Sequence, residues 1–420
     1  MFETYIFHID VNSAYLSWEA AYRIHHLGYT QDLRLLPSAV AGDTALRRGI
    51  ILAKSLPAKR YGIQTGECIF QAKQKYPHLL LIPPNYTLYQ RCSIAMIDLI
   101  KTYSPAVEPY SIDEVFADMT GIIPNTCDTS SKKDILEYGK RLQTTIQNEL
   151  GFTVNIGISS NKLLAKMASD FQKPNKIHTL FPDEIPKKLW PLPVSNLFFC
   201  GPSHTKKLYT LGIRTIGELA KTDPLFLRQH LKKHGELLWN FANGRDFSLV
   251  SPTLPPQKGY GNSTTLPHDV TDPDQARLVL LSLCETVGAR LRKDHVQAGV
   301  LSLSIKNNDF FCSSRQSVLS DPTNVTMELY KSSCLLFEHL WNHQPIRQLG
   351  IHTKNILSSP CSRQRSFSDS DDIQKLAAWD KTVDSIRHRF GTDSLMRCCF
   401  LNQPQDHMGG GISREKWQAL

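Results

Sequence analysis

Two adjacent carboxylates, Asp113 and Glu114, stand inside the otherwise apolar, strand-like run Y-S-I-D-E-V-F-A-D at residues 110–118. Neighbouring residues on a regular strand point to opposite faces of a sheet, so one of the two acids is expected to be buried. Burying an unpaired charge costs several kcal/mol, and two close carboxylates resist ionising together. The fold must therefore supply something at this place that neutralises negative charge.

At 420 residues the chain is too long for one compact core, and we expect roughly two to four domains. Charged residues make up 21% and hydrophobic residues 41% of the chain, which is typical of a soluble globular protein. The net charge of +9 suits a polyanionic partner, although a merely basic soluble protein would carry the same charge.

No apolar run approaches the ~20 residues that span a bilayer, and the N-terminus M-F-E-T-Y-I-F-H-I-D lacks the pattern of a signal peptide. The ten cysteines are scattered and include no C-x-x-C pair. This usage predicts free thiols in a reducing cytosol and argues against a zinc site. We therefore expect a cytoplasmic protein with no membrane partner.

The first part of the chain is predicted to be a mixed α/β domain. Residues 5–11 alternate as a strand that carries Asp10 near its end, where a lone acid is ordinarily a cap or turn residue. The following S-A-Y-L-S-W-E-A-A-Y-R has helical character, and residues 114–118 and 152–158 are predicted strands. Strands separated by helical stretches favour an α+β sheet domain.

A smaller segment, between the first helix and residue 76, interleaves basic side chains with short apolar runs. The basic residues are Arg47, Arg48, Lys54, Lys59 and Arg60. Such a stretch is most often a solvated face, but beside an acidic metal site it could hold a triphosphate.

From about residue 170 the composition changes. The stretch C-G-P-S-H-T-K-K-L-Y-T-L-G-I-R-T-I-G-E-L-A has glycine turns between short helices, around Gly212 and Gly217. Residues 200–245 carry eight Lys or Arg against three acids. A Gly-rich hairpin that opens a helix presents free backbone N–H groups, which suits contact with nucleic acid phosphates. An ordinary helical hairpin has the same spacing.

Beyond the proline-rich linker at residues 251–257, the pattern changes again. Asp272 caps a predicted helix with proline at its first position. The run V-L-S-L-S-I-K then alternates as a strand with Lys306 on its polar face, and a second strand near residue 351 places Lys354 on the same kind of face. A sheet with helices on one side and hydroxyl and lysine side chains on the other would suit a nucleic acid backbone.

Four motifs, H-I-D-V-N-S-A-Y, Y-S-I-D-E-V-F-A-D, G-I-S-S-N-K-L-L-A-K-M-A-S and L-G-I-R-T-I-G-E-L-A, occur in this order. Through this combination, residues 5–356 resemble the Y-family translesion DNA polymerases of the DinB/UmuC type. The resemblance implies an α+β multidomain right-hand polymerase with a palm, fingers, a helical thumb built on a helix-hairpin-helix, and an α/β little finger. The expected bounds are 1–30 and 77–168 for the palm, 31–76 for the fingers, 169–250 for the thumb, 251–257 for the linker, 258–358 for the little finger and 359–420 for a UmuC-like tail.

The resemblance also implies what neutralises the acid pair. Asp10, Asp113 and Glu114 would converge on two Mg²⁺ ions, and the carbonyl of Val11 would complete a metal site. Hard divalent cations prefer oxygen ligands, and two of them can activate a primer 3′-hydroxyl and stabilise the leaving pyrophosphate. A structural salt bridge is the alternative for the pair.

Further residues match the nucleotide site of the family. Tyr15 matches the bulky residue that screens the sugar 2′ position, and Lys162 matches the lysine that meets the incoming triphosphate. A core aromatic and a solvated helix lysine are the ordinary alternatives. The family usually has Tyr and Arg where Leu56 and Lys59 stand here, but UmuC-like members carry a lysine at the latter position. We therefore expect Lys59 to bind phosphate.

Two other departures concern the first motif and the thumb. Asn12 replaces a frequent second Asp that is not a required metal ligand. In the first half of the thumb hairpin, C-G-P replaces the usual G-I-G, which would weaken one phosphate contact. DNA contacts are then expected at Gly212 and Gly217 of the hairpin and at Lys306 and Lys354 of the little finger.

The tail reads Q-R-S-F-S, residues 364–368, where family members often carry a short clamp-binding segment resembling Q-L-S-L-F. Gln364 and Phe367 could dock on a sliding clamp, but Arg365 and Ser368 stand where apolar anchors are expected. A plain linker is the alternative, because a degenerate short motif is weak evidence.

The sequence thus predicts a template-dependent DNA polymerase that copies past damaged bases, with primer–template DNA and deoxynucleoside triphosphates as partners. Two alternatives stay open. One is a two-metal cyclase or phosphodiesterase on a similar palm, and the other is a non-catalytic DNA-bound scaffold at stalled forks.

Overall fold

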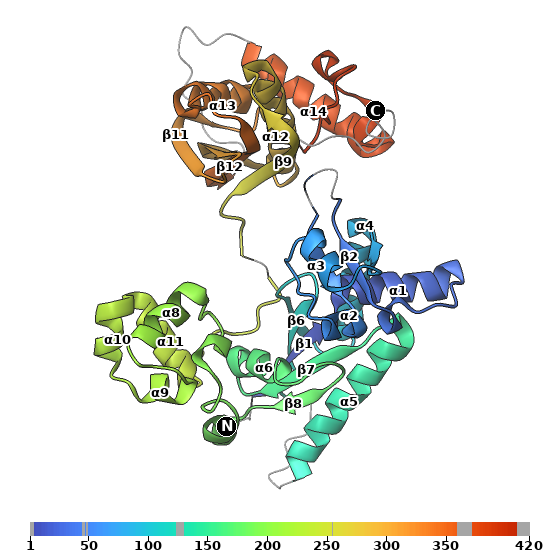
Figure 1. Cartoon of the computed structure of the whole chain (residues 1–420), viewed down its shortest axis with the longest axis vertical. Coiled ribbons are helices and arrows are strands. Elements are labelled where there is room, and N and C mark those ends of the chain that lie inside the picture. Colours follow the sequence, from blue (N-terminus) through green and yellow to red (C-terminus); the bar gives the residue numbers. More distant parts are fainter. Residues whose placement is uncertain are drawn as a thin grey trace. The chain divides into compact units, whose positions relative to one another are not determined.

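The computed structural model describes residues 4–43, 47, 49–122, 130–253, 255–358 and 372–409. Contacts divide the chain into two compact units (Figure 1). The first comprises Met1–Gly42 and Ile50–Leu254, and the second comprises Asp43–Gly49 and Pro255–Leu420. Over the described ranges, no helix combines the length and the apolar character needed to cross a bilayer.

The first unit is built on a five-stranded sheet in the order β5-β6-β1-β7-β8. Its strands are β1 (Ile6–Val11), β5 (Ala106–Pro109), β6 (Glu114–Asp118), β7 (Val154–Ser159) and β8 (Ile177–Thr179). The strands expected at residues 5–11 and 114–118 are confirmed, and the third expected strand begins two residues later than predicted. All six residues of the central strand β1 are buried, because helices cover both faces of the sheet.

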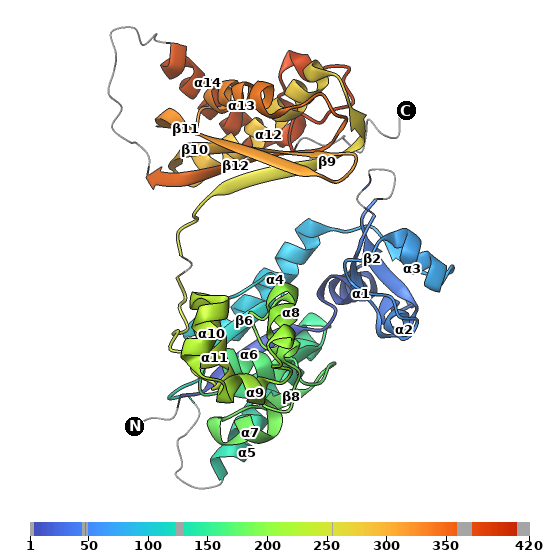
Figure 2. The same ribbon diagram turned by 60° about the vertical axis from the view of Figure 1, so that its left-hand side comes forward.

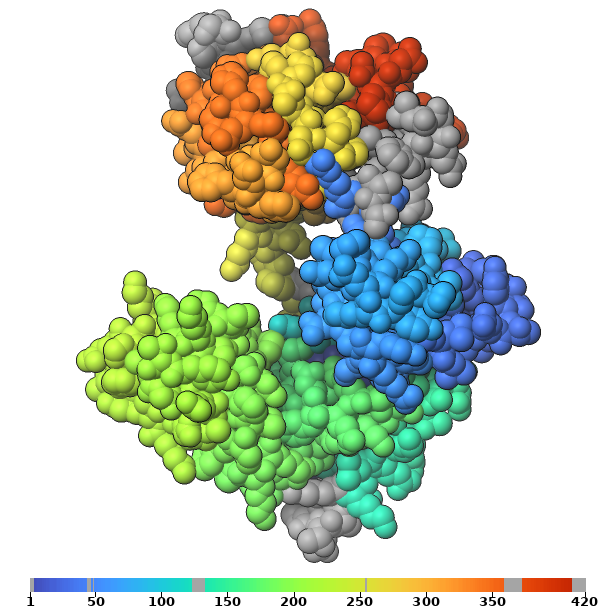
Figure 3. All heavy atoms as spheres, viewed as in Figure 1, coloured from blue at the N-terminus to red at the C-terminus, as the bar shows by residue number. Residues whose placement is uncertain are grey.

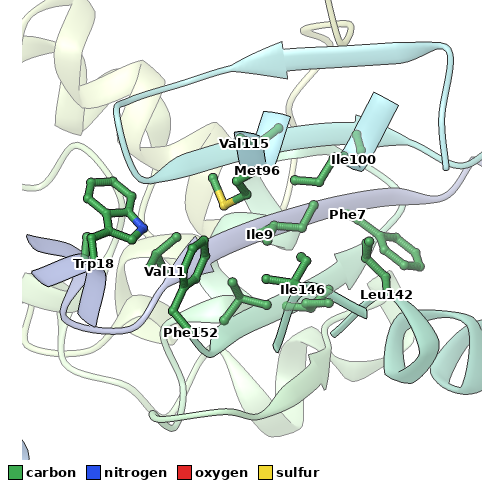
Figure 4. Close-up of a cluster of buried hydrophobic side chains, with 14 of the residues drawn as sticks. Phe7, Ile9, Val11, Trp18, Met96, Ile100, Val115, Leu142, Ile146 and Phe152 are labelled. Carbon is green, nitrogen blue, oxygen red and sulfur yellow. The ribbon is translucent and has the colours of Figure 1, made fainter. Parts of the chain in front are cut away.

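One face of this sheet packs on three long helices and the other on a short one. The long helices are α1 (Ala14–Leu27), α4 (Tyr86–Lys101) and α5 (Ser130–Leu150). Figure 4 shows Phe7, Ile9 and Val11 meeting side chains of these helices in the main core. On the other face, α6 (Lys162–Ser169) lies close to β7 at Gly157, where a Cβ would lie 1.9 Å from the carbonyl oxygen of Ala165.

A three-stranded sheet, in the order β3-β2-β4, forms a smaller subdomain with its own core. It contains β2 (Ser38–Ala41), β3 (Ile51–Lys54), β4 (Leu80–Ile82), α2 (Leu56–Arg60) and α3 (Ile69–Lys75). Strand β4 pairs in parallel with β2. The subdomain therefore extends beyond residue 76, where the sequence placed the end of this segment.

The rest of the first unit is helical. It contains α7 (Ile185–Lys188), α8 (Pro202–Thr210), α9 (Ile216–Lys221), α10 (Pro224–Leu231) and α11 (Lys233–Ala242) around a separate core. In Figure 1 this helical part and the three-stranded sheet lie on opposite sides of the five-stranded sheet, and Figure 3 shows them as two separate masses of side chains.

The second unit has a four-stranded antiparallel sheet in the order β11-β10-β12-β9, with two helices on one face (Figure 2). The elements are β9 (Tyr260–Val270), α12 (Pro273–Lys293), β10 (Val296–Asn307), β11 (Cys312–Thr323), α13 (Thr326–Leu340) and β12 (Ile346–Ser358). The predicted cap is confirmed, since the Asp272 carboxylate accepts hydrogen bonds from the first amides of α12.

The described part of the tail packs onto this unit. Helix α14 (Asp372–Phe390) lies against α12 and is joined to it by buried ion pairs. Arg292 binds Asp380 at 3.0 Å, and Glu285 binds Arg387 at 2.7 Å, with the Glu285 and Arg387 side chains 3% and 7% exposed. The tail that the sequence set apart is therefore part of the second unit.

Candidate active site

The pairing of β1 with β6 brings the three predicted acids to one end of the five-stranded sheet. Asp10 lies opposite Glu114 in the register, and the Val11 amide donates to the Asp113 carbonyl at 3.0 Å. Strand β6 begins at Glu114, so Asp113 lies in the preceding turn and the alternation of a regular strand does not apply to the pair. Asp113 and Glu114 are both half-buried, whereas Asp10 is 8% exposed.

Two lysines and a hydroxyl neutralise or orient these acids. Lys166 of α6 binds Glu114 at 2.7 Å, and Lys173 binds Asp10 at 3.0 Å. The Ser111 hydroxyl donates to Asp113 at 2.7 Å. Burial raises the pKa of Asp10 to about 7, against the lowering effect of Lys173, and Glu114 raises it further. The raised pKa shows that the ionised form of Asp10 is unfavourable here unless a further positive charge is present. The ligand atoms that the acids offer are all oxygens, which hard divalent cations prefer.

Asp10 and Asp113 face a cleft of about 840 Å³. Among the predicted site residues, those that line it are Asp10, Val11, Tyr15, Lys59 and Asp113. The substituted position Leu56 lines it too, as do Lys54 and Lys173. Glu114 and Lys162 are not among the described residues of its wall.

Lys162, which was expected to meet the incoming triphosphate, binds a carboxylate of the protein. Its ammonium donates to both carboxylate oxygens of Glu108, at 2.7 and 2.8 Å, and lies 5.1 Å from the Phe116 ring. The lysine that reaches both the cleft and the acids is Lys173, in the stretch F-Q-K-P-N. Sequence reasoning missed it, because nothing in the local pattern links a lysine after α6 to an acid on β1.

Tyr15 lies at the cleft with its ring held from behind. It stacks on Tyr89 with centroids 4.5 Å apart and planes 10° from parallel. The Tyr89 hydroxyl donates to the buried Glu19 carboxylate at 3.0 Å, and Glu19 also meets Arg23 at 3.5 Å. Burial raises the pKa of Tyr15, and the charge of Asp113 adds to the effect.

The polar groups of Asn12 are used inside the protein. Its amide nitrogen donates to Asn155 at 3.1 Å, and its oxygen accepts from the Thr153 hydroxyl at 3.1 Å and from the Asn175 amide at 2.9 Å. These bonds tie β1 to the segment that carries Lys173.

The sequence led us to expect free N–H groups at the glycine hairpin, but the amides around Gly212 and Gly217 are hydrogen-bonded within the protein. The Gly217 amide donates to the Trp190 carbonyl at 3.0 Å, and a Cβ at this glycine would lie 2.9 Å from the Trp190 Cβ. The amides of Arg214 and Thr215 donate to Glu218, and the exposed Gly212, at φ +81°, donates to Tyr209. Gly217 is therefore a packing glycine.

In the second unit, Lys306 and Lys354 stand on the sheet face opposite the helices, as predicted. Their neighbours Leu303, Ile305 and Ile351 point into the core. Lys354 is exposed and donates to Gln316 at 3.2 Å. The proposed clamp-binding residues Gln364 and Phe367 lie outside the described residues.

The comparisons with known proteins agree with one another. The model of the impB/mucB/samB family matches residues 9–170, and that of the C-terminal domain of the same family matches residues 257–367. The chain is 40% identical over 400 residues to a protein of Clostridium acetobutylicum named DNA polymerase IV, covering 95% of this chain and 99% of the relative. It is 35% identical over 408 residues to DNA polymerase IV 1 of Bacillus subtilis, covering 96% and 95%.

A solved structure of a Y-family DNA polymerase chimera of Dbh and Dpo4 superposes with a TM-score of 0.70, over 84% of this chain and 100% of that one. At 19% identity this likeness shows a shared fold. The family models and the near full-length relatives, together with this shared fold, show that the chain belongs to the impB/mucB/samB family of DinB-type Y-family polymerases.

Proposed function

We propose that the chain is a template-directed DNA polymerase of the translesion type, which extends a primer 3′ end and copies past damaged template bases in DNA damage tolerance. The observation that carries this proposal is the set of three acids at the end of β1 and β6, of which Asp10 and Asp113 face the cleft. Relatives named DNA polymerase IV, aligned along nearly the whole chain, support the activity.

Y-family polymerases are metal-dependent, and the acids here fit that chemistry. Asp10, Asp113, Glu114 and the Val11 carbonyl would hold two Mg²⁺ ions, since all four offer hard oxygen ligands. When bound, such ions activate the primer 3′-hydroxyl and neutralise charge on the leaving pyrophosphate. Lys166 keeps Glu114 in place through its ion pair.

The remaining cleft residues would each contact a different part of the incoming nucleotide. Tyr15 would screen the sugar 2′ position, because its ring lines the cleft and is backed by Tyr89. Lys59 and Lys173 would bind the triphosphate, since both line the same cleft. We assign Lys162 a positioning role through Glu108, which also accepts a hydrogen bond from the Ser251 amide at 2.8 Å.

Primer–template DNA would be held largely by lysine side chains. Lys306 and Lys354 stand on the polar sheet face of the second unit. In the thumb, the exposed Lys206 and Lys207 of α8 are better placed for phosphate contact than the Gly217 amide, which is already bonded.

The two alternatives have no comparable support. A cyclase or phosphodiesterase needs neither a group that screens a sugar 2′ position nor a helical thumb, and the matched relatives are named as DNA polymerases. A non-catalytic scaffold needs no acid set, yet Asp10, Asp113 and Glu114 are all present and close together.

Primer extension with Mg²⁺, on intact and damaged templates, tests the proposal. Asp113→Asn should abolish nucleotide addition and leave primer–template binding nearly unchanged, because the lost carboxylate serves the chemical step. Asp98→Asn is the matched control, since this acid is exposed on α4 and, among the described residues, pairs with Lys101 at 2.9 Å. Full extension by Asp113→Asn would overturn the assignment of the acids.

A further inference from the structure

Lys54 is the last residue of β3, and its side chain lines the cleft that holds Asp10 and Tyr15. Its ammonium donates to the Thr65 hydroxyl at 3.0 Å. Glu67, the acid whose charge acts on it, is bonded to Lys75 at 2.5 Å instead. Within the described ranges, Lys54 therefore has a hydroxyl partner and no ion pair.

Two other cations of the cleft, Lys173 and Arg34, do form ion pairs. Lys173 binds both Asp10 and Asp170, and Arg34 binds Asp32 at 2.9 Å. Lys59, like Lys54, has no ion pair among the residues that the structure describes. The cleft wall formed by β3 and α2 thus carries two positive charges that form no ion pair with a described acid.

These two charges act on each other. Burial lowers the pKa of Lys54, the charge of Lys59 lowers it further, and Glu67 opposes the shift. Like charges in a partly buried wall are unfavourable unless an anion lies between them. The wall is therefore electrostatically suited to a polyanionic ligand.

The local chain path explains why Lys54 reaches the cleft. The hydroxyl of Ser55 caps α2 by accepting from the Ala58 amide at 3.1 Å and donates to the Leu36 carbonyl at 2.6 Å, so this side chain is turned into the protein. Ser55 and the residues on either side of it, Lys54 and Leu56, all line the cleft, but Ser55 is buried and its hydroxyl is already hydrogen-bonded. Leu56 stands where the family usually has Tyr, and its side chain has no hydrogen-bond donor.

We propose that Lys54 is a phosphate ligand for the triphosphate of the incoming deoxynucleotide and acts with Lys59 in place of the hydroxyl that Leu56 lacks. This inference rests on the proposed polymerase function. An ammonium has three donors, so Lys54 can keep its bond to Thr65 and still donate to phosphate oxygens. Recognition of this kind depends on the phosphates and not on the base.

The test compares Lys54→Met with the parent protein. A primer ending in a dideoxynucleotide permits equilibrium binding of the next correct deoxynucleoside triphosphate without reaction, and KM is measured on an extendable primer. We expect both the equilibrium Kd and the KM for the triphosphate to rise about ten- to a hundredfold, as for the loss of a charge-assisted hydrogen bond. The corresponding diphosphate should lose less, and the Kd for primer–template DNA should not change.

Lys73→Met is the matched control, because Lys73 is an exposed lysine of α3 in the same subdomain and does not line the cleft. Adding Leu56→Tyr to Lys54→Met should restore much of the lost affinity by returning a donor to the family's position. Lys54→Gln gives a second variant of similar length, and thermal unfolding shows whether each variant is folded.

The outcomes separate this inference from the function on which it rests. If the parent protein extends no primer at all, the proposed polymerase function fails. If the parent extends primers and the folded Lys54 variants bind triphosphate as tightly as it does, the phosphate role of Lys54 is wrong and the function stands. A loss of DNA affinity in place of nucleotide affinity would likewise overturn it.

Discussion

Tyr15→Ala should admit ribonucleotides to the cleft. The ring lines the cleft near Asp10 and Asp113, and its removal would free the space that a 2′-hydroxyl needs. Selectivity is measured as the ratio of kcat/KM for a deoxynucleotide to kcat/KM for the matching ribonucleotide. The ratio should collapse in Tyr15→Ala, whereas activity with the deoxynucleotide persists.

A smaller loss of sugar selectivity is expected when Tyr15 is kept and its stacking partner Tyr89 is replaced. Tyr89 stacks on it nearly in parallel at 4.5 Å, and such a pair contributes about 0.5–1.5 kcal/mol beyond the area it buries. Tyr89→Leu keeps Tyr15 but removes this contact. If the whole contribution serves to hold the ring in place, sugar selectivity should fall about two- to thirteenfold.

Tyr89→Phe separates stacking from hydrogen bonding. It keeps the aromatic contact but removes the hydroxyl that donates to Glu19, so we expect lower stability with selectivity close to that of the parent. Tyr22→Leu is the control, since this tyrosine of α1 has a ring contact only with His26 among those the structure describes.

Two results would refute the reasoning. If Tyr15→Ala discriminates against ribonucleotides as strongly as the parent, another residue screens the sugar. If Tyr89→Leu leaves selectivity unchanged while Tyr15→Ala abolishes it, the ring of Tyr15 does not depend on its stacking partner.

Three further predictions concern other parts of the chain. Glu285→Gln should destabilise the second unit by about 3–5 kcal/mol in urea unfolding, because it leaves the buried Arg387 without its counter-charge. Burial would raise the pKa of Glu285, but hydrogen bonds from two arginines outweigh this effect and lower the pKa. The stability that the parent has over Glu285→Gln should therefore be present at neutral pH and be lost as the pH falls through the lowered pKa. Gly217→Ala should destabilise the helical part of the first unit by about 1–3 kcal/mol in thermal unfolding, since its Cβ would lie 2.9 Å from that of a tryptophan. A peptide of residues 358–374 should bind a sliding clamp weakly and lose binding with Phe367→Ala; no binding in titration would leave this segment a linker.

Local periodicity was enough to predict the framework of the site. The alternation in residues 5–11 and the short run at 114–118 each predicted a strand, and the structure pairs these strands with Asp10 opposite Glu114. The helix after Asp272 was also predictable, because its capping acid and its first-turn proline are both local signals.

The partners of the acids were not predictable in the same way. Lys162 and Lys166 share one helical motif, yet one binds Glu108 and the other binds Glu114. Which of them faces the acids depends on how α6 lies on the sheet, where Gly157 lets the two backbones approach. Lys173 comes from the loop beyond, 163 residues from Asp10. Such contacts are tertiary, and no spacing rule reports them.

The glycine hairpin shows a different limit. Gly-rich turns before a helix can offer amides to phosphate, but the same spacing also serves close packing, and only the acceptors nearby decide between the two. Here Glu218 takes the amides of Arg214 and Thr215, and the Trp190 carbonyl takes that of Gly217. The second half of the hairpin is thus satisfied within the protein.

The docking of the tail depends on charges that the sequence keeps far apart. Asp380 binds Arg292 from 88 residues away, and Arg387 binds Glu285 from 102 residues away. Each residue alone resembles an ordinary charge on the exposed face of a helix. Both pairs belong to a larger network, because Asp384 also binds Arg292 and Arg397 also binds Glu285. Helix α14 is thus joined to α12 by a network of largely buried, mutually compensating charges. A hydrophobic pattern cannot reveal an interface of this kind.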